Sequence, residues 1–208
     1  MTEMIEILQK GPVVPVIVID DLDNAVPLAT ALVEGGLEVL EVTLRTPVAI
    51  EAVKEMKNAL PDAVIGTGTV TNMQTLHQSL EAGADFMVSP GATNSLLRDA
   101  VSEGALLLPG AATPSEAMHL YEEGFVCQKF FPAEAAGGVA MLKSIAGPLP
   151  QITFCPTGGI SNTNATNYLA LNNVACVGGT WMLDKNLIQQ KDWSAITELA
   201  RQAKQIVS

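Results

Sequence analysis

Short runs of β-branched and other apolar residues recur at regular intervals along the chain. Each run has the length of a buried strand, and each is followed by a segment with apolar residues at helical spacing, as in residues 23–36 and 71–85. The predicted strands are residues 13–19, 37–44, 63–69, 85–89, 105–109, 125–131, 151–156 and 174–179. This alternation of strands and helices is typical of an α/β fold with a parallel sheet.

Eight such units favour closure of the sheet into a barrel. The pattern predicts a single-domain (β/α)8 TIM barrel over residues 1–208, with an N-terminal helix at 2–10 and a closing helix at 193–207. Glycines end several of the predicted helices just before the next strand, as C-terminal caps do. An open doubly wound sheet is the alternative, and eight regular units in so short a chain make it the weaker one.

The amino-acid composition is that of a globular protein and excludes some classes of partner. Hydrophobic residues make up 48% of the 208 residues, which is enough for a sizeable core. The net charge of −11 would repel nucleic acids and anionic membrane surfaces, so neither is expected as a partner. The first 21 residues have neither the charge order of a signal peptide nor the length of a membrane span.

The three cysteines, Cys127, Cys155 and Cys176, lie in apolar runs without CxxC spacing. They are therefore interpreted as reduced core residues of a cytoplasmic protein.

In a barrel the chemistry lies at the carboxyl ends of the strands. Glu41, Thr43 and Arg45 alternate along the second predicted strand and therefore share one face, with Arg45 at the carboxyl end. Glu38 falls on the opposite face and is expected to be solvated. A carboxylate and a guanidinium facing the same way form either a candidate site or a structural ion pair. Of the three arginines, only Arg45 stands at a predicted barrel mouth, where its planar fork would suit an anionic substrate.

Lys129 differs from the other seven lysines because apolar strand residues flank it on both sides. Burial disfavours the charged form of an amine, and a neutral amine can attack a carbonyl carbon to give a Schiff base. The alternative is a lysine whose charged end reaches water from the end of the strand. The position of Lys129 in the sequence does not distinguish a Schiff-base lysine from a solvated one.

Two glycine pairs follow the seventh and eighth predicted strands, each beside a threonine. Thr157 precedes Gly158 and Gly159, and Gly179 precedes Thr180. Barrels often bind phosphate at this place through backbone N–H groups and a helix N-terminus. The two pairs together therefore indicate a phosphorylated ligand.

The motifs EVTLRTP, GTGTV, SPG, KFFPAE, FCPTGGIS and GGTW, in this order and over nearly the whole chain, resemble the bacterial 2-dehydro-3-deoxy-phosphogluconate (KDPG) aldolases. Members of this family often also act on 4-hydroxy-2-oxoglutarate (KHG). The resemblance implies a metal-independent class I aldolase on a TIM barrel, assembled as a homotrimer. Its substrate would be cleaved to pyruvate and glyceraldehyde 3-phosphate.

The resemblance also implies roles for individual residues. Lys129 would form the Schiff base and Glu41 would act as general acid and base. Arg45 and Thr69 would hold the pyruvate carboxylate, and Pro90 would line the pocket.

By the same resemblance, the phosphate would be held by Gly158, Gly159, Gly179 and Thr180, with Thr157 near the sugar hydroxyls. Family members often have serine in the place of Thr180. Its hydroxyl is kept, while the added methyl group could alter phosphate affinity or acceptor range.

No metal ion and no other cofactor is expected. The two histidines, His77 and His119, lie in helix-like segments without ligand spacing and are interpreted as surface or packing residues.

Other functions stay open at this level. The motifs do not distinguish substrates derived from gluconate from those derived from galactonate. A phosphate-binding barrel isomerase or synthase would share the glycine pairs, and in a non-catalytic sugar-phosphate binding protein Glu41 and Lys129 could form a structural pair.

Overall fold

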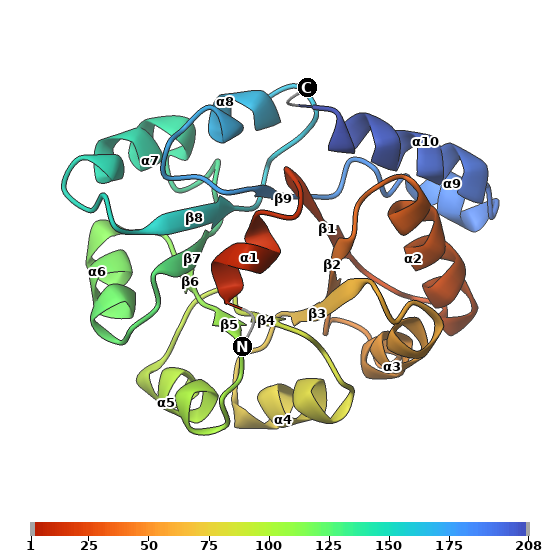
Figure 1. Ribbon diagram of the computed structural model, residues 1–208, viewed down its shortest axis with the longest axis horizontal. Helices are drawn as coiled ribbons and strands as arrows, with labels where there is room; N and C mark the ends of the chain where they lie inside the picture. The colour runs from red at the N-terminus through yellow and green to blue at the C-terminus, as the bar shows by residue number, and fades with distance from the viewer. Residues whose placement is uncertain (1–2, 207–208) are drawn as a thin grey trace.

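The computed structural model describes residues 3–206, which form an α/β fold with a curled parallel sheet surrounded by helices (Figure 1). The strands are β1 (Val13–Ile17), β2 (Val39–Thr43), β3 (Val64–Gly68), β4 (Met87–Val88), β5 (Leu107–Leu108), β6 (Gly110–Ala111), β7 (Cys127–Phe130), β8 (Thr153–Pro156) and β9 (Val177–Gly179). Except for β6, which lies just beyond the predicted strand at 105–109, each lies within a predicted strand and is shorter than predicted.

The strands form two hydrogen-bonded sheets, in which all pairs are parallel. One has the order β5-β4-β3-β2-β1-β9 and the other the order β6-β7-β8. Two isolated parallel bridges, Phe154 with Val174 and Thr157 with Gly178, connect the β8 and β9 regions. Strands that are neighbours in sequence are neighbours in space, so the order does not reverse as it would in a doubly wound sheet.

The predicted strand at 105–109 is shortened to β5 in the structure, and the unpredicted strand β6 follows it directly. Pro109 separates β5, which pairs with β4, from β6, which pairs with β7. A proline cannot donate a ladder hydrogen bond, and this explains the interruption. The carbonyl of Pro109 still accepts a 2.9 Å hydrogen bond from the backbone N–H of Lys129, which fixes the register of β7.

The helices are α1 (Met4–Leu8), the 3₁₀ turn η1 (Leu22–Asn24), α2 (Ala25–Glu34), α3 (Ala49–Ala59), α4 (Met73–Glu81), α5 (Asn94–Ser102), α6 (Pro114–Glu122), α7 (Gly138–Ala146), α8 (Ala165–Leu169), α9 (Lys185–Gln189) and α10 (Trp193–Lys204). The predicted helices at 2–10 and 193–207 are confirmed in their interiors, while Thr2 and Val207 lie outside the described residues. Helix α9 is the helix expected after the last strand, whereas η1 was not predicted. Among residues 3–206, no helix has both the length and the apolar composition that crossing a bilayer requires.

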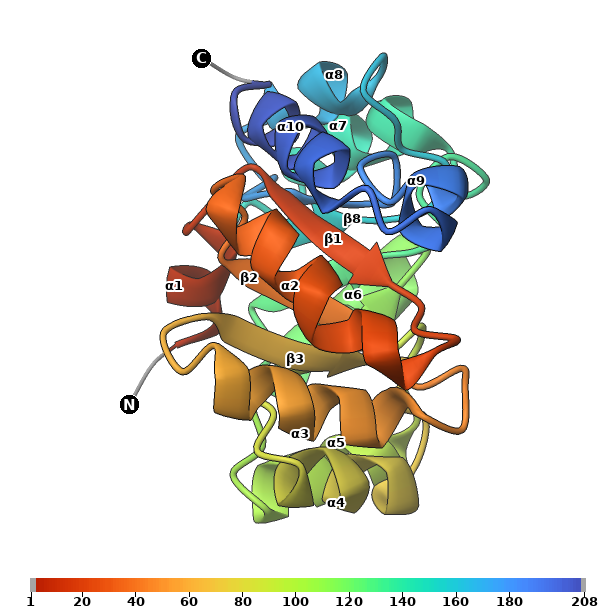
Figure 2. The same ribbon diagram turned by 90° about the vertical axis from the view of Figure 1, so that its right-hand side faces the viewer.

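Helix α1 lies across the amino-terminal ends of the strands. Figure 2 shows it at the opposite end from the arrowhead of β1, and in Figure 1 it covers the centre of the ring of strands. Its buried Met4, Ile7 and Leu8 pack with apolar residues of the strand interior, including the three cysteines. The carboxyl ends of the strands thus form the open end of the inner core.

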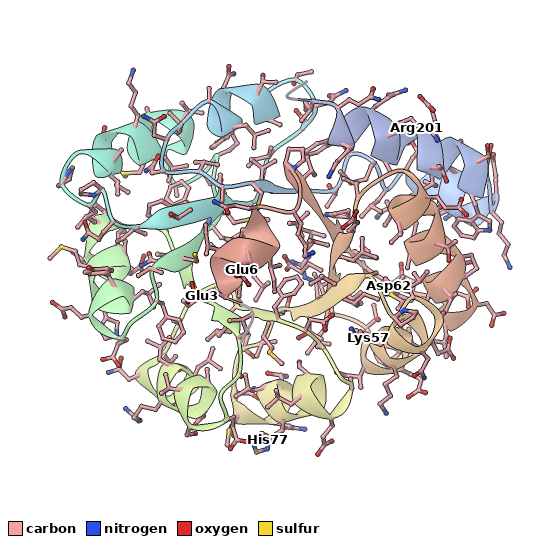
Figure 3. The ribbon with its side chains drawn as sticks, in the orientation of Figure 1. Glu3, Glu6, Lys57, Asp62, His77 and Arg201 are labelled. Atoms are coloured by element: carbon pink, nitrogen blue, oxygen red, sulfur yellow. The ribbon has the colours of Figure 1, made fainter. Side chains whose placement is uncertain are left out.

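A second and larger core lies between the strands and the outer helices. Four glycines that follow helices have positive φ and hydrogen-bond back to the last turn, as predicted from the breaks in sequence: Gly36, Gly83, Gly104 and Gly124. Most charged side chains lie on the surface, and the buried Glu41 and Lys129 are exceptions. In Figure 3, His77 on α4 and Arg201 on α10 lie on the outer helices.

Candidate active site

Lys129 lies in β7, and its side chain is buried inside the ring of strands. The residue is 4% exposed, so the alternative of a solvated strand-end lysine is wrong. Its Nζ lies 3.3 Å from Oε1 of Glu41 and 5.3 Å from the centre of the Phe131 ring. The ammonium is therefore held between a carboxylate and an aromatic ring, both of which favour a positive charge.

Glu41 reaches Lys129 from β2, on the other side of the interior. The pairing of Glu41 with Val16 of β1 and Gly66 of β3 fixes its height along the strand. A Cβ atom at Gly68 would lie 2.1 Å from Oε1 of Glu41, so only glycine leaves room for the carboxylate there. Glu38 is exposed, as the alternation along this strand predicts.

Arg45 and Thr69 meet at the carboxyl ends of β2 and β3. The Nε of Arg45 donates a 3.3 Å hydrogen bond to Oγ1 of Thr69. Thr69 has a φ of 65°, a left-handed conformation that costs a threonine roughly 1–3 kcal/mol. Such strain is concentrated at functional sites, and here it aims the Thr69 hydroxyl at an exposed arginine.

Pro90 follows β4 and packs closely against the next strand. A Cβ atom at Gly110 would lie 2.4 Å from the backbone carbonyl carbon of Pro90, so glycine is required there. Pro90 and Phe131 line a small pocket of about 90 Å³ between the loops after β4, β6 and β7. The predicted pocket residue thus lies beside the aromatic ring that contacts Lys129.

The loop after β8 carries Thr157, Gly158 and Gly159. The two glycines have φ values of 103° and 77°. The carbonyls of Thr157 and Gly158 accept hydrogen bonds of 2.8 and 3.1 Å from the N–H groups of Ala133 and Glu134. Helix α8 begins only at Ala165, so the N–H groups at these glycines belong to a loop and not to a helix N-terminus.

Gly179 and Thr180 end β9 beside this loop. A Cβ atom at Gly178 would lie 2.3 Å from Oγ1 of Thr157, and one at Gly179 would lie 1.9 Å from the ring of Trp181. These glycines therefore make room for side chains of the protein itself. The backbone N–H groups of Gly159 and Thr180 have no hydrogen-bond acceptor within residues 3–206, which leaves both donors available to an anion.

A cleft of about 470 Å³ opens at the carboxyl ends of β1 and β9. Thr180 lines it, together with Lys185 and Lys191 of the α9 region and Asp20 and Asp21 after β1. Lys129 and Glu41 do not line this cleft, because they lie deeper in the interior. Among the predicted site residues, the exposed Thr180 lines this cleft.

The cysteines lie in the inner core, and His119 of α6 lines the small pocket with Pro90 and Phe131. All three cysteines are free and buried, as predicted. Burial, followed by the nearby Cys155 and Glu3, raises the pKa of Cys127 to about 11, and a hydrogen bond to Cys155 followed by burial raises the pKa of Cys176. Within the described residues, no group of three or more His, Cys, Asp or Glu side chains is arranged to hold a metal ion.

Sequence reasoning missed several residues that shape the site. Phe131 was interpreted as a strand residue only, and Gly68 carried no signal beyond its place in GTGTV. The side-chain hydroxyl of Tyr168 on α8 donates a hydrogen bond to Oε1 of Glu134, a pair separated by 34 residues. A contact between residues this far apart leaves no local pattern in the sequence.

Comparison with known proteins places the chain in a family of carbon–carbon lyases. The family model described as KDPG and KHG aldolase matches residues 4–199. The chain belongs to this aldolase family.

Individual relatives support membership of the same family. The chain is 51% identical over 198 residues to the 2-dehydro-3-deoxy-phosphogluconate aldolase of Pseudoalteromonas atlantica, covering 95% of this chain and 92% of that protein. It is 52% identical to the KHG/KDPG aldolase of Escherichia coli K12, with the same coverage. A crystal structure of KDPG aldolase from Legionella pneumophila superposes with a TM-score of 0.95, at 49% identity over 98% of both chains. In that structure, pyruvate is captured at low pH as a covalent carbinolamine intermediate.

Proposed function

We propose that this protein is a metal-independent class I aldolase that cleaves 2-dehydro-3-deoxy-6-phosphogluconate to pyruvate and glyceraldehyde 3-phosphate. The observation that carries the proposal is the buried pair of Lys129 and Glu41, with Nζ and Oε1 3.3 Å apart. A covalent carbinolamine of pyruvate in a relative 49% identical to this chain supports amine chemistry on a keto acid.

The fold supports this function as a closed (β/α)8 barrel in one domain. Strand β1 pairs with both β2 and β9, and the bridge of Thr157 with Gly178 joins β8 to β9. The remaining gap lies at Pro109, where β5 and β6 continue one another along the chain. Every strand except β5 and β6 has two neighbours, and in our proposal the ring closes between these two at Pro109.

Lys129 is the nucleophile in this mechanism. Its amine, after losing a proton to Glu41 or to water, attacks the C2 ketone to give a carbinolamine, and loss of water gives the iminium. Glu41 assists the dehydration and then takes the proton of the C4 hydroxyl as the C3–C4 bond breaks. The electron pair of that bond moves into the iminium, so that glyceraldehyde 3-phosphate leaves and an enamine remains. Protonation at C3 and hydrolysis of the imine release pyruvate and regenerate the lysine.

The two ends of the substrate are anions and need separate donors. Arg45 and Thr69 hold the carboxylate beside Pro90, because a guanidinium fork and a hydroxyl match its two oxygens. The phosphate lies at the other end, on Gly158, Gly159, Gly179 and Thr180, with Thr157 near the sugar hydroxyls. The free N–H groups of Gly159 and Thr180 are the donors in this assignment.

The smaller 4-hydroxy-2-oxoglutarate is proposed as a second substrate, cleaved to pyruvate and glyoxylate. It needs only Lys129, Glu41 and the carboxylate site. A relative of 52% identity carries both activities in its name. The substrate derived from galactonate is the alternative, and kcat/KM values for the three compounds decide among them.

Trapping with borohydride in the presence of pyruvate tests the central claim. Reduction of the Schiff base should leave a stable mass adduct on the peptide that contains Lys129. An adduct on another peptide, or none, would exclude this mechanism. Activity should persist in EDTA, since no step requires a metal ion.

A further inference from the structure

The turn that follows β7 fixes the orientation of the glycine loop after β8. The N–H of Glu134 donates to the carbonyl of Gly158, and the N–H of Ala133 donates to the carbonyl of Thr157. In a trans peptide the carbonyl and the following N–H point in opposite directions. The N–H of Gly159 is therefore turned away from the Glu134 turn, toward the side on which it has no acceptor within residues 3–206.

The side chain of Glu134 contacts the same loop. A Cβ atom at Gly159 would lie 2.6 Å from Cγ of Glu134, so the glutamate stem occupies the space that Gly159 leaves. Gly159 also has a positive φ of 77°, which a larger residue would adopt only with strain. Glu134 thus holds this loop twice, through its backbone N–H at the Gly158 carbonyl and through its side chain at Gly159.

Tyr168 holds the carboxylate of Glu134 in place. Tyr168 lies on α8 and is 0% exposed, and its hydroxyl donates to Oε1 of Glu134. Burial, followed by this hydrogen bond, raises the pKa of Tyr168, so tyrosine is the proton donor of the pair. An added Cβ at Gly138 would lie 3.1 Å from the Tyr168 hydroxyl oxygen, so Gly138 leaves room for the pair.

We infer that Glu134 and Tyr168 are positioning residues for the phosphate end of the substrate, an inference that rests on the proposed function. Tyr168 turns the negative carboxylate toward α8, and Glu134 presents the Gly159 N–H to the phosphate. Without the tyrosine hydroxyl, the Glu134 side chain loses its fixed orientation, so its stem no longer holds Gly159 in position. The same turn follows the strand of Lys129, so it links the phosphate loop to the reacting lysine.

The Tyr168→Phe variant tests this inference with two substrates that differ only in the phosphate. The KM for the phosphorylated sugar acid should rise about tenfold, the loss expected for one hydrogen bond to a charged group. The KM for the same sugar acid without phosphate should not change, nor should the pyruvate concentration that gives half-maximal trapping. Tyr121→Phe is the matched control, because Tyr121 is the other tyrosine and lies exposed on α6.

Two Glu134 variants keep the inference testable if Tyr168→Phe does not fold. Glu134 is an exposed residue, so Glu134→Ala should fold, and it should reproduce the KM increase. Glu134→Gln keeps an oxygen acceptor for Tyr168, so its KM for the phosphorylated substrate should equal that of the unmodified protein. An unchanged KM for the phosphorylated substrate in Glu134→Ala, or equal losses with both substrates, would overturn the inference.

The proposed function can fail separately from this inference. If the unmodified protein gave no pyruvate adduct, the aldolase function would be excluded. Inorganic phosphate, titrated by the fluorescence of Trp181 beside Gly179, then serves as the probe. Weaker phosphate binding in Glu134→Ala supports the positioning role, and equal binding overturns it.

Discussion

The Nζ of Lys129 on β7 lies 3.3 Å from Oε1 of Glu41 on β2, and each side chain is only 5% exposed. Removing two charges from water costs several kcal/mol per ion, and their attraction offsets this only in part. A buried ion pair is therefore a poor device for stability. The free-energy cost of burying this pair is explained if Lys129 serves as the nucleophile and Glu41 carries protons.

Lys129→Arg should abolish the pyruvate adduct. Arginine keeps a positive charge opposite Glu41, but a guanidinium is a very poor nucleophile at neutral pH. We expect kcat/KM to fall by roughly 10⁴-fold or more. Mass spectrometry after borohydride reduction checks the adduct, and an adduct in this variant would exclude Lys129 as the Schiff-base lysine.

Lys129→Met should destabilise the fold as well as inactivate the protein. It leaves the Glu41 carboxylate buried without its partner, at a cost of about 3–5 kcal/mol in free energy of unfolding. Urea denaturation measures this change. Lys143→Met is the control, because Lys143 is exposed on α7 and its loss should leave the unfolding midpoint nearly unchanged.

Glu41→Gln should slow turnover while still allowing the lysine to react. The amide cannot accept the C4 hydroxyl proton, so kcat should fall about 10²- to 10⁴-fold. Borohydride trapping with pyruvate should still label Lys129, at a reduced rate. A kcat equal to that of the unmodified protein would remove Glu41 from the mechanism.

Gly68→Ala should impair catalysis through a single methyl group. The new Cβ would lie 2.1 Å from Oε1 of Glu41, which must then move away from Lys129. We expect a lower kcat together with reduced stability. Gly147→Ala is the matched control, since a Cβ at Gly147 meets no atom within 4 Å and its φ is negative. Equal activities for the two variants would contradict this role of Gly68.

Stability should decline in alkali partly through Cys127. Its pKa is about 11 in the folded protein against an ordinary value of 9.0, because burial disfavours the thiolate, so the folded state holds the thiol proton more tightly. Stability from this group is complete below pH 9 and is lost as pH rises through about 11. Urea unfolding at pH 9 to 11, the range that this shift covers, should show a smaller loss of unfolding free energy for Cys127→Ala than for the unmodified protein. Parallel declines would contradict the shifted pKa.

A homotrimer stays a prediction that rests on the family resemblance. Light scattering should give a mass three times the 21.8 kDa of one chain. A mass of one or two chains would contradict it.

The sequence by itself determined the alternation of strands and helices and the set of unusual polar residues. Period-two and period-3.6 patterns are local, so the strands were predicted close to their observed positions, and Lys129 was recognised because apolar residues flank it. The separate strand β6 after Pro109 was not predicted, since its pairing depends on which backbone groups find partners across the sheet.

Tertiary structure decided which of those residues meet. Lys129 and Glu41 are 88 positions apart, and only the curling of the sheet brings them to one height inside it. The roles of the glycines also depend on contacts across the fold, because Gly68 makes room for Glu41 and Gly159 makes room for Glu134. Side-chain patterns record which face a residue occupies, whereas close packing between distant strands sets the distances on which chemistry depends.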